Sequence, residues 1–165
     1  MKKTTQVKFF SWLAVFIALS AVGAAIKVPS HVGSVALDSF PALAAAALMG
    51  SGAGAMVAAL GHLVSAMISG FPLGPMHLII AAEMAILVWL FGFIYRKNKT
   101  IISGLIFIFG NTIVAPLPFI FLISKAFFIL MLPSLFVGSL INTVITLVVV
   151  PRLVSVVNPK ISEGK

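Results

Sequence analysis

The amino-acid sequence predicts an all-α integral membrane protein with six transmembrane helices and both termini in the cytoplasm. The 165-residue chain is 61% hydrophobic and only 8% charged, whereas soluble domains carry roughly 25% charged residues. Apolar runs recur six times between charges or Gly/Pro clusters, and the basic residues gather at the ends of these runs. Because no charged or Pro/Ser-rich linker divides the chain, residues 1–165 are predicted to form a single membrane domain.

The six apolar runs define the predicted helices. They cover about residues 9–26, 37–50, 53–69, 76–95, 101–120 and 125–150. The second run is shorter than the roughly 20 residues that a full span needs, so we expect this helix to line a cavity rather than to cross the bilayer. The N-terminal run also imitates a cleavable secretory signal. Since it is as long as the later runs, we expect it to be retained as the first span.

The basic residues predict the orientation of the bundle. Only Lys27 and Lys125 lie at one set of helix ends, and the nine others lie at the opposite set: Lys2, Lys3, Lys8, Arg96, Lys97, Lys99, Arg152, Lys160 and Lys165. Loops rich in Lys and Arg stay in the cytoplasm. This asymmetry accounts for most of the net charge of +8, so we predict no nucleic-acid partner.

Polar residues within apolar spans are costly and usually mark a pathway or a binding site. The candidates are Asp38, Ser39, His62, His77, Glu83, Asn111, Lys125 and Asn142. Asp38 or Ser39 can cap a helix that has Pro41 in its first turn, and a capping oxygen at a cavity rim can also accept a hydrogen bond from a ligand. His77 follows a Gly/Pro-rich loop and can contact a ligand. His62 and Glu83 can equally make buried polar contacts between helices.

The chain lacks the patterns expected of an enzyme or a metal site. It contains no cysteine, no HExxH pair of metal-binding histidines, no GxSxG nucleophile motif and no phosphate-binding P-loop. We therefore predict no catalytic residues, no metal ligands and no cofactor in this chain. If its function consumes ATP, another subunit must hydrolyse it.

Small residues four positions apart form a further pattern. Ala14 and Ala18 give an AxxxA spacing in the first run, and Gly50 and Gly54 give a GxxxG spacing. Such residues let helices approach closely in lipid. The alanine stripe can therefore contact a partner subunit or pack within the bundle.

These features together resemble the substrate-binding S components of bacterial energy-coupling factor (ECF) vitamin transporters. The resemblance covers nearly the whole chain and includes the stripe "AVFIA" of the first helix. The stretches "GSVALDSFPALAAAALMG" and "LGHLVSAMISGFPLGPMH" look like the subgroup that contains the alpha-ribazole and pantothenate transporters. The resemblance implies a multi-pass protein of the bacterial cell membrane, surrounded by lipid. It also implies a transmembrane coupling subunit, which Ala14 and Ala18 contact, and two ATPase subunits.

The resemblance further implies a ligand pocket in the outer half of the bundle, under the loop from Val28 to Leu37. The residues expected there are Asp38, Ser39, Phe71, Pro72, His77, Glu83 and Asn111. A mostly apolar pocket with a few polar groups suits alpha-ribazole, a precursor of cobalamin. Pantothenate, an anion, favours a cation such as Lys125 or Lys27. Two competing hypotheses remain. The chain is a membrane enzyme that uses the histidines or Glu83, or it is an accessory protein without a ligand.

Overall fold

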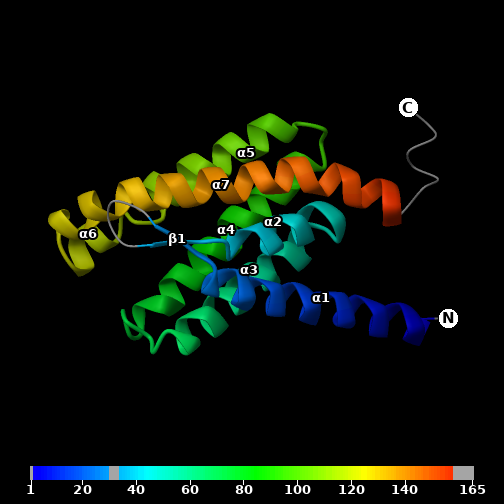
Figure 1. Cartoon of the computed structure of the whole chain (residues 1–165), viewed down its shortest axis with the longest axis horizontal. Helices are drawn as coiled ribbons and strands as arrows, with labels where there is room; N and C mark the ends of the chain where they lie inside the picture. Colours follow the sequence, from blue (N-terminus) through cyan, green and yellow to red (C-terminus); the bar gives the residue numbers. More distant parts are fainter. Residues whose placement is uncertain (1, 30–33, 158–165) are drawn as a thin grey trace.

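The computed structural model describes residues 2–29 and 34–157 and consists almost entirely of helices (Figure 1). Five helical stretches among these residues are long and apolar enough to cross a membrane: Gln6–Ala25, Ser51–Ile68, Met76–Tyr95, Thr100–Leu122 and Lys125–Leu153. The elements in order are α1 (Lys2–Ala25), β1 (Lys27–Pro29), β2 (Ser34–Ala36), α2 (Ser39–Leu48), α3 (Ser51–Ile68), α4 (Met76–Tyr95), α5 (Thr100–Phe109), η1 (Gly110–Val114), α6 (Phe119–Leu122) and α7 (Lys125–Val157). The predicted all-helical membrane fold is confirmed.

The predicted short second helix is α2, and it lies at the centre of the bundle. Its ten residues span about 15 Å, half the thickness of a bilayer core. Side chains on all of its faces are buried, and it contacts α1, α3, α4 and α7. A helix that is apolar all round is stable only when other helices surround it, so α2 is the element around which the longer helices pack.

Close packing of α2 depends on glycines in its neighbours. A side chain at Gly54 of α3 would overlap Ala46 of α2, and a Cβ atom at Gly92 of α4 would lie 2.9 Å from the Ala46 Cβ. The two glycines of the GxxxG pair therefore have different roles. Gly54 forms a helix contact, whereas Gly50 has φ of 116° at the break between α2 and α3, a conformation that favours glycine.

A short antiparallel hairpin joins α1 to α2 and was not predicted from the sequence. Lys27 pairs with Ala36, and Pro29 pairs with Ser34. Residues 30–33 at the tip of the predicted outer loop lie outside the described residues. After the hairpin, the Leu37 N–H donates to the Gly23 carbonyl of α1 over 3.1 Å. This bond fixes the start of α2 against the last turns of α1.

The fifth predicted span is interrupted near its C-terminal end. The helix α5 passes into the π-helical turn η1, in which the Ala115 N–H donates to the Gly110 carbonyl over 2.8 Å. Pro116 and Pro118 follow in the sequence, and proline has no N–H to continue the helical hydrogen bonds. The chain therefore turns before the short α6, and Pro118 takes the N-cap position of that helix.

The two ends of the molecule differ in charge. Figure 1 shows the start of α1, the end of α7 and the connection between α4 and α5 at one end, and α6 and the connection between α3 and α4 at the other. The described side chains at the first end include Lys8, Lys97, Lys99 and Arg152, whereas Lys125 opens α7 at the second end. We call these the basic end and the opposite end.

Candidate functional site

A cavity of about 100 Å³ lies near the opposite end, between α4, η1, α6 and the first part of α7. Its lining is apolar apart from Glu83 and Asn111: Leu73, Ile80, Glu83, Asn111, Ala115, Pro116, Phe119, Phe127, Met131 and Leu135. The rings of Phe119 and Phe127 lie 6.1 Å apart. A largely apolar cavity with a few polar groups is typical of a site for a small organic molecule.

Glu83 enters this cavity from α4. It follows Ile80 by three residues, so both side chains lie on the same face of the helix. The Oε2 atom of Glu83 is buried and has no hydrogen-bond partner among the described residues. Buried polar atoms are nearly always hydrogen-bonded in folded proteins, so an unpartnered carboxyl oxygen beside a cavity is a candidate ligand contact.

Asn111 enters from η1 on the other side of the cavity. Its Nδ2 atom donates to the Ser139 hydroxyl of α7 over 2.8 Å. That hydroxyl donates in turn to the Leu135 carbonyl over 2.6 Å. Asn111 is thus held by α7, and π-helical turns are often found at functional sites.

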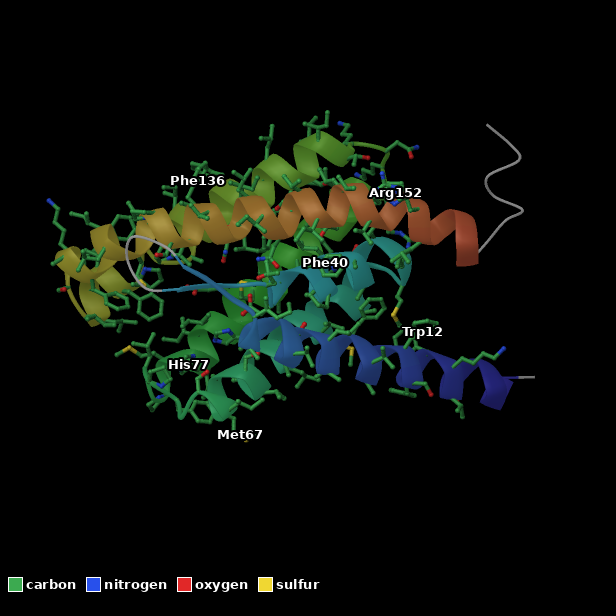
Figure 2. All side chains as sticks on the ribbon, in the orientation of Figure 1. Trp12, Phe40, Met67, His77, Phe136 and Arg152 are labelled. Carbon is green, nitrogen blue, oxygen red and sulfur yellow. The ribbon has the colours of Figure 1, made fainter. Side chains whose placement is uncertain are left out.

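A second asparagine on α7 organises the start of α2. Asn142 lies one turn after Ser139, and its Oδ1 atom accepts a hydrogen bond from the Phe40 N–H over 2.7 Å. Its Nδ2 atom donates to the Gly138 carbonyl. Asn142 therefore supplies a capping oxygen to a helix 102 residues away in the sequence. Figure 2 shows Phe40 in the middle of the bundle.

Asp38 and Ser39 do not cap α2, contrary to the sequence prediction. Asp38 occupies the N-cap position, but its side chain makes no capping bond, because its backbone is helical (φ −84°, ψ −24°) rather than extended. Its Oδ1 atom accepts a hydrogen bond from the Ser39 hydroxyl over 3.2 Å. Burial raises the pKa of the Asp38 carboxyl, and the bond from Ser39 acts in the opposite direction. Neither residue is among those that line the cavity.

His77 holds the loop between α3 and α4. Its Nε2 atom accepts a hydrogen bond from the Leu73 N–H over 3.3 Å, and its Nδ1 atom lies 3.1 Å from the Nε2 atom of His62. The accepting Nε2 atom places the proton of a neutral His77 on Nδ1, so His77 donates to His62. Because Leu73 lines the cavity, His77 supports one cavity wall through the backbone. Figure 2 shows His77 far from Trp12 and Arg152, which mark the basic end.

Phe71 and Pro72 belong to the same loop, and both are exposed. The Phe71 ring packs edge-on against His77 with 5.7 Å between ring centres. Phe71 has φ of 49°, between two glycines that also have positive φ, Gly70 and Gly74. The loop is therefore tightly turned, and the histidine pair closes it on the inner side.

Replacement of His77 by phenylalanine should lower the melting temperature of the detergent-solubilised protein. The variant keeps an aromatic ring but leaves the Leu73 N–H without an acceptor, which costs about 1–3 kcal/mol where the group is buried. His62→Phe is the matched control, because it removes the contact between the histidines and preserves the bond from Leu73. Thermal unfolding of both variants measures the difference, and equal melting temperatures would contradict this role of His77.

The alanines Ala14 and Ala18 lie on the outer face of α1. Leu13, Phe16 and Ser20 are buried against the bundle, whereas Ala14 and Ala18 are exposed. Residues 6–12 are exposed on every face of the helix, and Figure 1 shows the first turns of α1 projecting from the bundle. Within the described chain, Ala14 and Ala18 are thus free to contact lipid or a partner, and internal packing of α1 uses other residues.

Sequence reasoning selected Glu83 and Asn111 but missed their neighbours in the site. Ser139, Phe119 and Phe127 were not singled out, since serine and phenylalanine are common in membrane helices. The sequence did contain one signal for Ser139. It lies three residues before Asn142, and two polar residues at this spacing share one face of a helix. Across residues 2–29 and 34–157, no group of three or more His, Cys, Asp or Glu side chains is placed to hold a metal ion.

Comparison with known proteins identifies the family of the chain. No curated protein matches the chain. The family model described as "ECF transporter, substrate-specific component" matches residues 10–154. Members of that family are transport subunits rather than enzymes. The chain therefore belongs to the family of ECF transporter substrate-specific components.

Proposed function

We propose that this protein captures a vitamin or vitamin precursor outside a bacterial cell, with alpha-ribazole as the preferred substrate. The observation that carries this proposal is the apolar cavity into which Glu83 and Asn111 project. Its two neighbouring phenylalanines, whose rings are tilted by 50° to each other, offer surfaces for a planar ring, and its two polar side chains offer partners for ribose hydroxyls. Pockets for drug-sized ligands have volumes of about 300–1,000 Å³, so the present cavity of about 100 Å³ is proposed to hold one end of such a molecule.

Pantothenate is the second candidate, and the charges around the cavity favour it less. An anion would lie beside the Glu83 carboxyl. Lys125 is exposed at the start of α7 and does not line the cavity, and the Lys27 side chain lies outside the described residues. The polar groups that the cavity does present therefore suit a ligand without a carboxylate.

The basic end is proposed to face the cytoplasm, because nine of the eleven Lys and Arg residues belong to it in sequence. Both termini are then cytoplasmic, and the cavity lies in the outer half of the membrane. Asp38 and Ser39 are proposed to lie at the rim of the site and to contact a ligand larger than the cavity, and Phe71, Pro72 and His77 are proposed to shape the loop beside it.

The energy for import is proposed to come from partner subunits, a transmembrane coupling subunit and two ATPases. No cofactor is proposed for this chain itself. The exposed stripe of Ala14 and Ala18 offers a close-packing surface to a helix of the coupling subunit.

Mass spectrometry of small molecules that co-purify with the detergent-solubilised protein tests this function. Cells expressing the protein are supplied with alpha-ribazole and pantothenate, and we expect alpha-ribazole at a near-equal molar ratio. Asn111→Leu should lose the ligand. Thr143→Val is the control, because Thr143 is buried on α7 outside the cavity lining and should retain it. Turnover of a ligand by the purified chain would favour an enzyme, and the absence of any ligand would favour an accessory protein.

A further inference from the structure

We propose that Glu83 and Asn111 select a substrate whose bound end donates hydrogen bonds and carries no negative charge, and that Ser139 is the residue that sets this selectivity. The inference rests on the proposed function and specifies the chemistry of the same cavity. It concerns three side chains from three different helical elements: α4, η1 and α7.

Ser139 determines which way the amide of Asn111 faces. A serine hydroxyl has one proton, and that of Ser139 is donated to the Leu135 carbonyl over 2.6 Å. Its oxygen can then only accept, so the Asn111 atom 2.8 Å away must be the NH₂ group. The carbonyl oxygen of the amide is consequently left as an acceptor on the side away from Ser139.

Glu83 adds a second acceptor to the same cavity. Its Oε2 atom is buried without a hydrogen-bond partner in the described part of the chain, and a carboxyl oxygen can accept a hydrogen bond from a ligand. Among the described residues that line the cavity, none is Lys, Arg or His. A ligand carboxylate or phosphate would therefore be buried in apolar surroundings without a cation to pair with, which is costly.

Hydroxyl and amine groups satisfy both acceptors at once. A pair of hydroxyls, as on a ribose, can donate one hydrogen bond to Glu83 and another to Asn111. An ammonium group can donate to both and also neutralise the carboxylate. The cavity thus distinguishes ligand groups that donate hydrogen bonds from ligand groups that only accept them, rather than one vitamin skeleton from another.

The test is a comparison of dissociation constants for the purified full chain in detergent. The probes are alpha-ribazole, its free base 5,6-dimethylbenzimidazole, thiamine as a cation and pantothenate as an anion. We expect the wild type to bind alpha-ribazole or thiamine at least tenfold more tightly than pantothenate, and alpha-ribazole at least tenfold more tightly than the free base.

Ser139→Ala should reduce the preference for alpha-ribazole over its free base about tenfold, because the Asn111 amide can then turn its NH₂ group toward the cavity. Ser139→Thr keeps a hydroxyl and should restore the preference. Thr143→Val, one turn further along α7, is the matched control and should leave it unchanged. A merely structural effect of Ser139 would weaken both ligands equally and would leave their ratio intact.

The outcomes separate this inference from the proposed function. Tighter binding of pantothenate than of alpha-ribazole and thiamine would overturn the inference and leave a vitamin-binding subunit. An unchanged ratio in Ser139→Ala would overturn the role of Ser139. Failure of the wild-type protein to bind any of the probes, in a sample that unfolds cooperatively on heating, would overturn the proposed function and the inference together.

Discussion

Gly54→Ala is expected to lower the melting temperature of the detergent-solubilised protein by several degrees. The added Cβ atom would overlap the side chain of Ala46 and lie 2.6 Å from its Cα atom. Ala46 has no room to withdraw, since it is completely buried and packs against Gly92 of α4 as well. Overpacking of this kind costs about 1–3 kcal/mol, and about 1 kcal/mol changes the melting temperature of a protein of this size by roughly 2–4 °C.

Gly52→Ala is the matched control for this experiment. Gly52 lies two residues earlier on α3, and a Cβ atom there would meet no other atom within 4 Å. Both substitutions gain the higher helix propensity of alanine, worth about 1 kcal/mol, so the difference between them isolates the contact with α2. Thermal unfolding monitored by tryptophan fluorescence measures it. Equal melting temperatures for the two variants would show that α3 can move away from α2 without loss of stability.

Most of the fold was predictable because each helix carries its own signal. Charges and Gly/Pro clusters marked the ends of the apolar runs, and the predicted run at 76–95 coincides with α4. The hairpin before α2 had no such signal, since its strands have only three residues each. The π-helical turn was equally hidden, because no local pattern marks it; its first residue, Gly110, lies against Leu87 of α4, a contact between distant parts of the sequence.

The members of the site were easier to predict than their arrangement. Glu83 and Asn111 stood out as polar residues in apolar spans, but they are 28 positions apart, and only the packed bundle brings them to one cavity. For Asp38, the local sequence predicted a role that the structure does not show. Its sequence context is typical of a helix cap, yet the capping oxygen belongs to Asn142 of α7, which accepts a hydrogen bond from the Phe40 N–H. A contact over such a separation competes with the local preference and cannot be read from the sequence near Asp38.

Ala18→Trp is expected to abolish most substrate uptake by cells while leaving the affinity of the isolated protein for its ligand unchanged. Ala18 is exposed on the outer face of α1, away from the buried side chains of Phe16 and Ser20. A tryptophan there points into lipid and does not disturb the bundle. It would, however, hold a partner helix away from α1, because close approach in lipid depends on small residues at the interface.

Leu19→Trp separates loss of docking from a general effect of a bulky residue on α1. Leu19 is also exposed, at 45%, but it lies about 100° around the helix from Ala18. In this variant, the cells should take up radiolabelled substrate at nearly the wild-type rate, and the isolated protein should bind its ligand with nearly the wild-type affinity. If Ala18→Trp and Leu19→Trp reduce uptake equally, the partner does not make its contact specifically through the alanine stripe. If Ala18→Trp transports normally, the coupling subunit contacts another surface, and the projecting first turns of α1 face lipid alone.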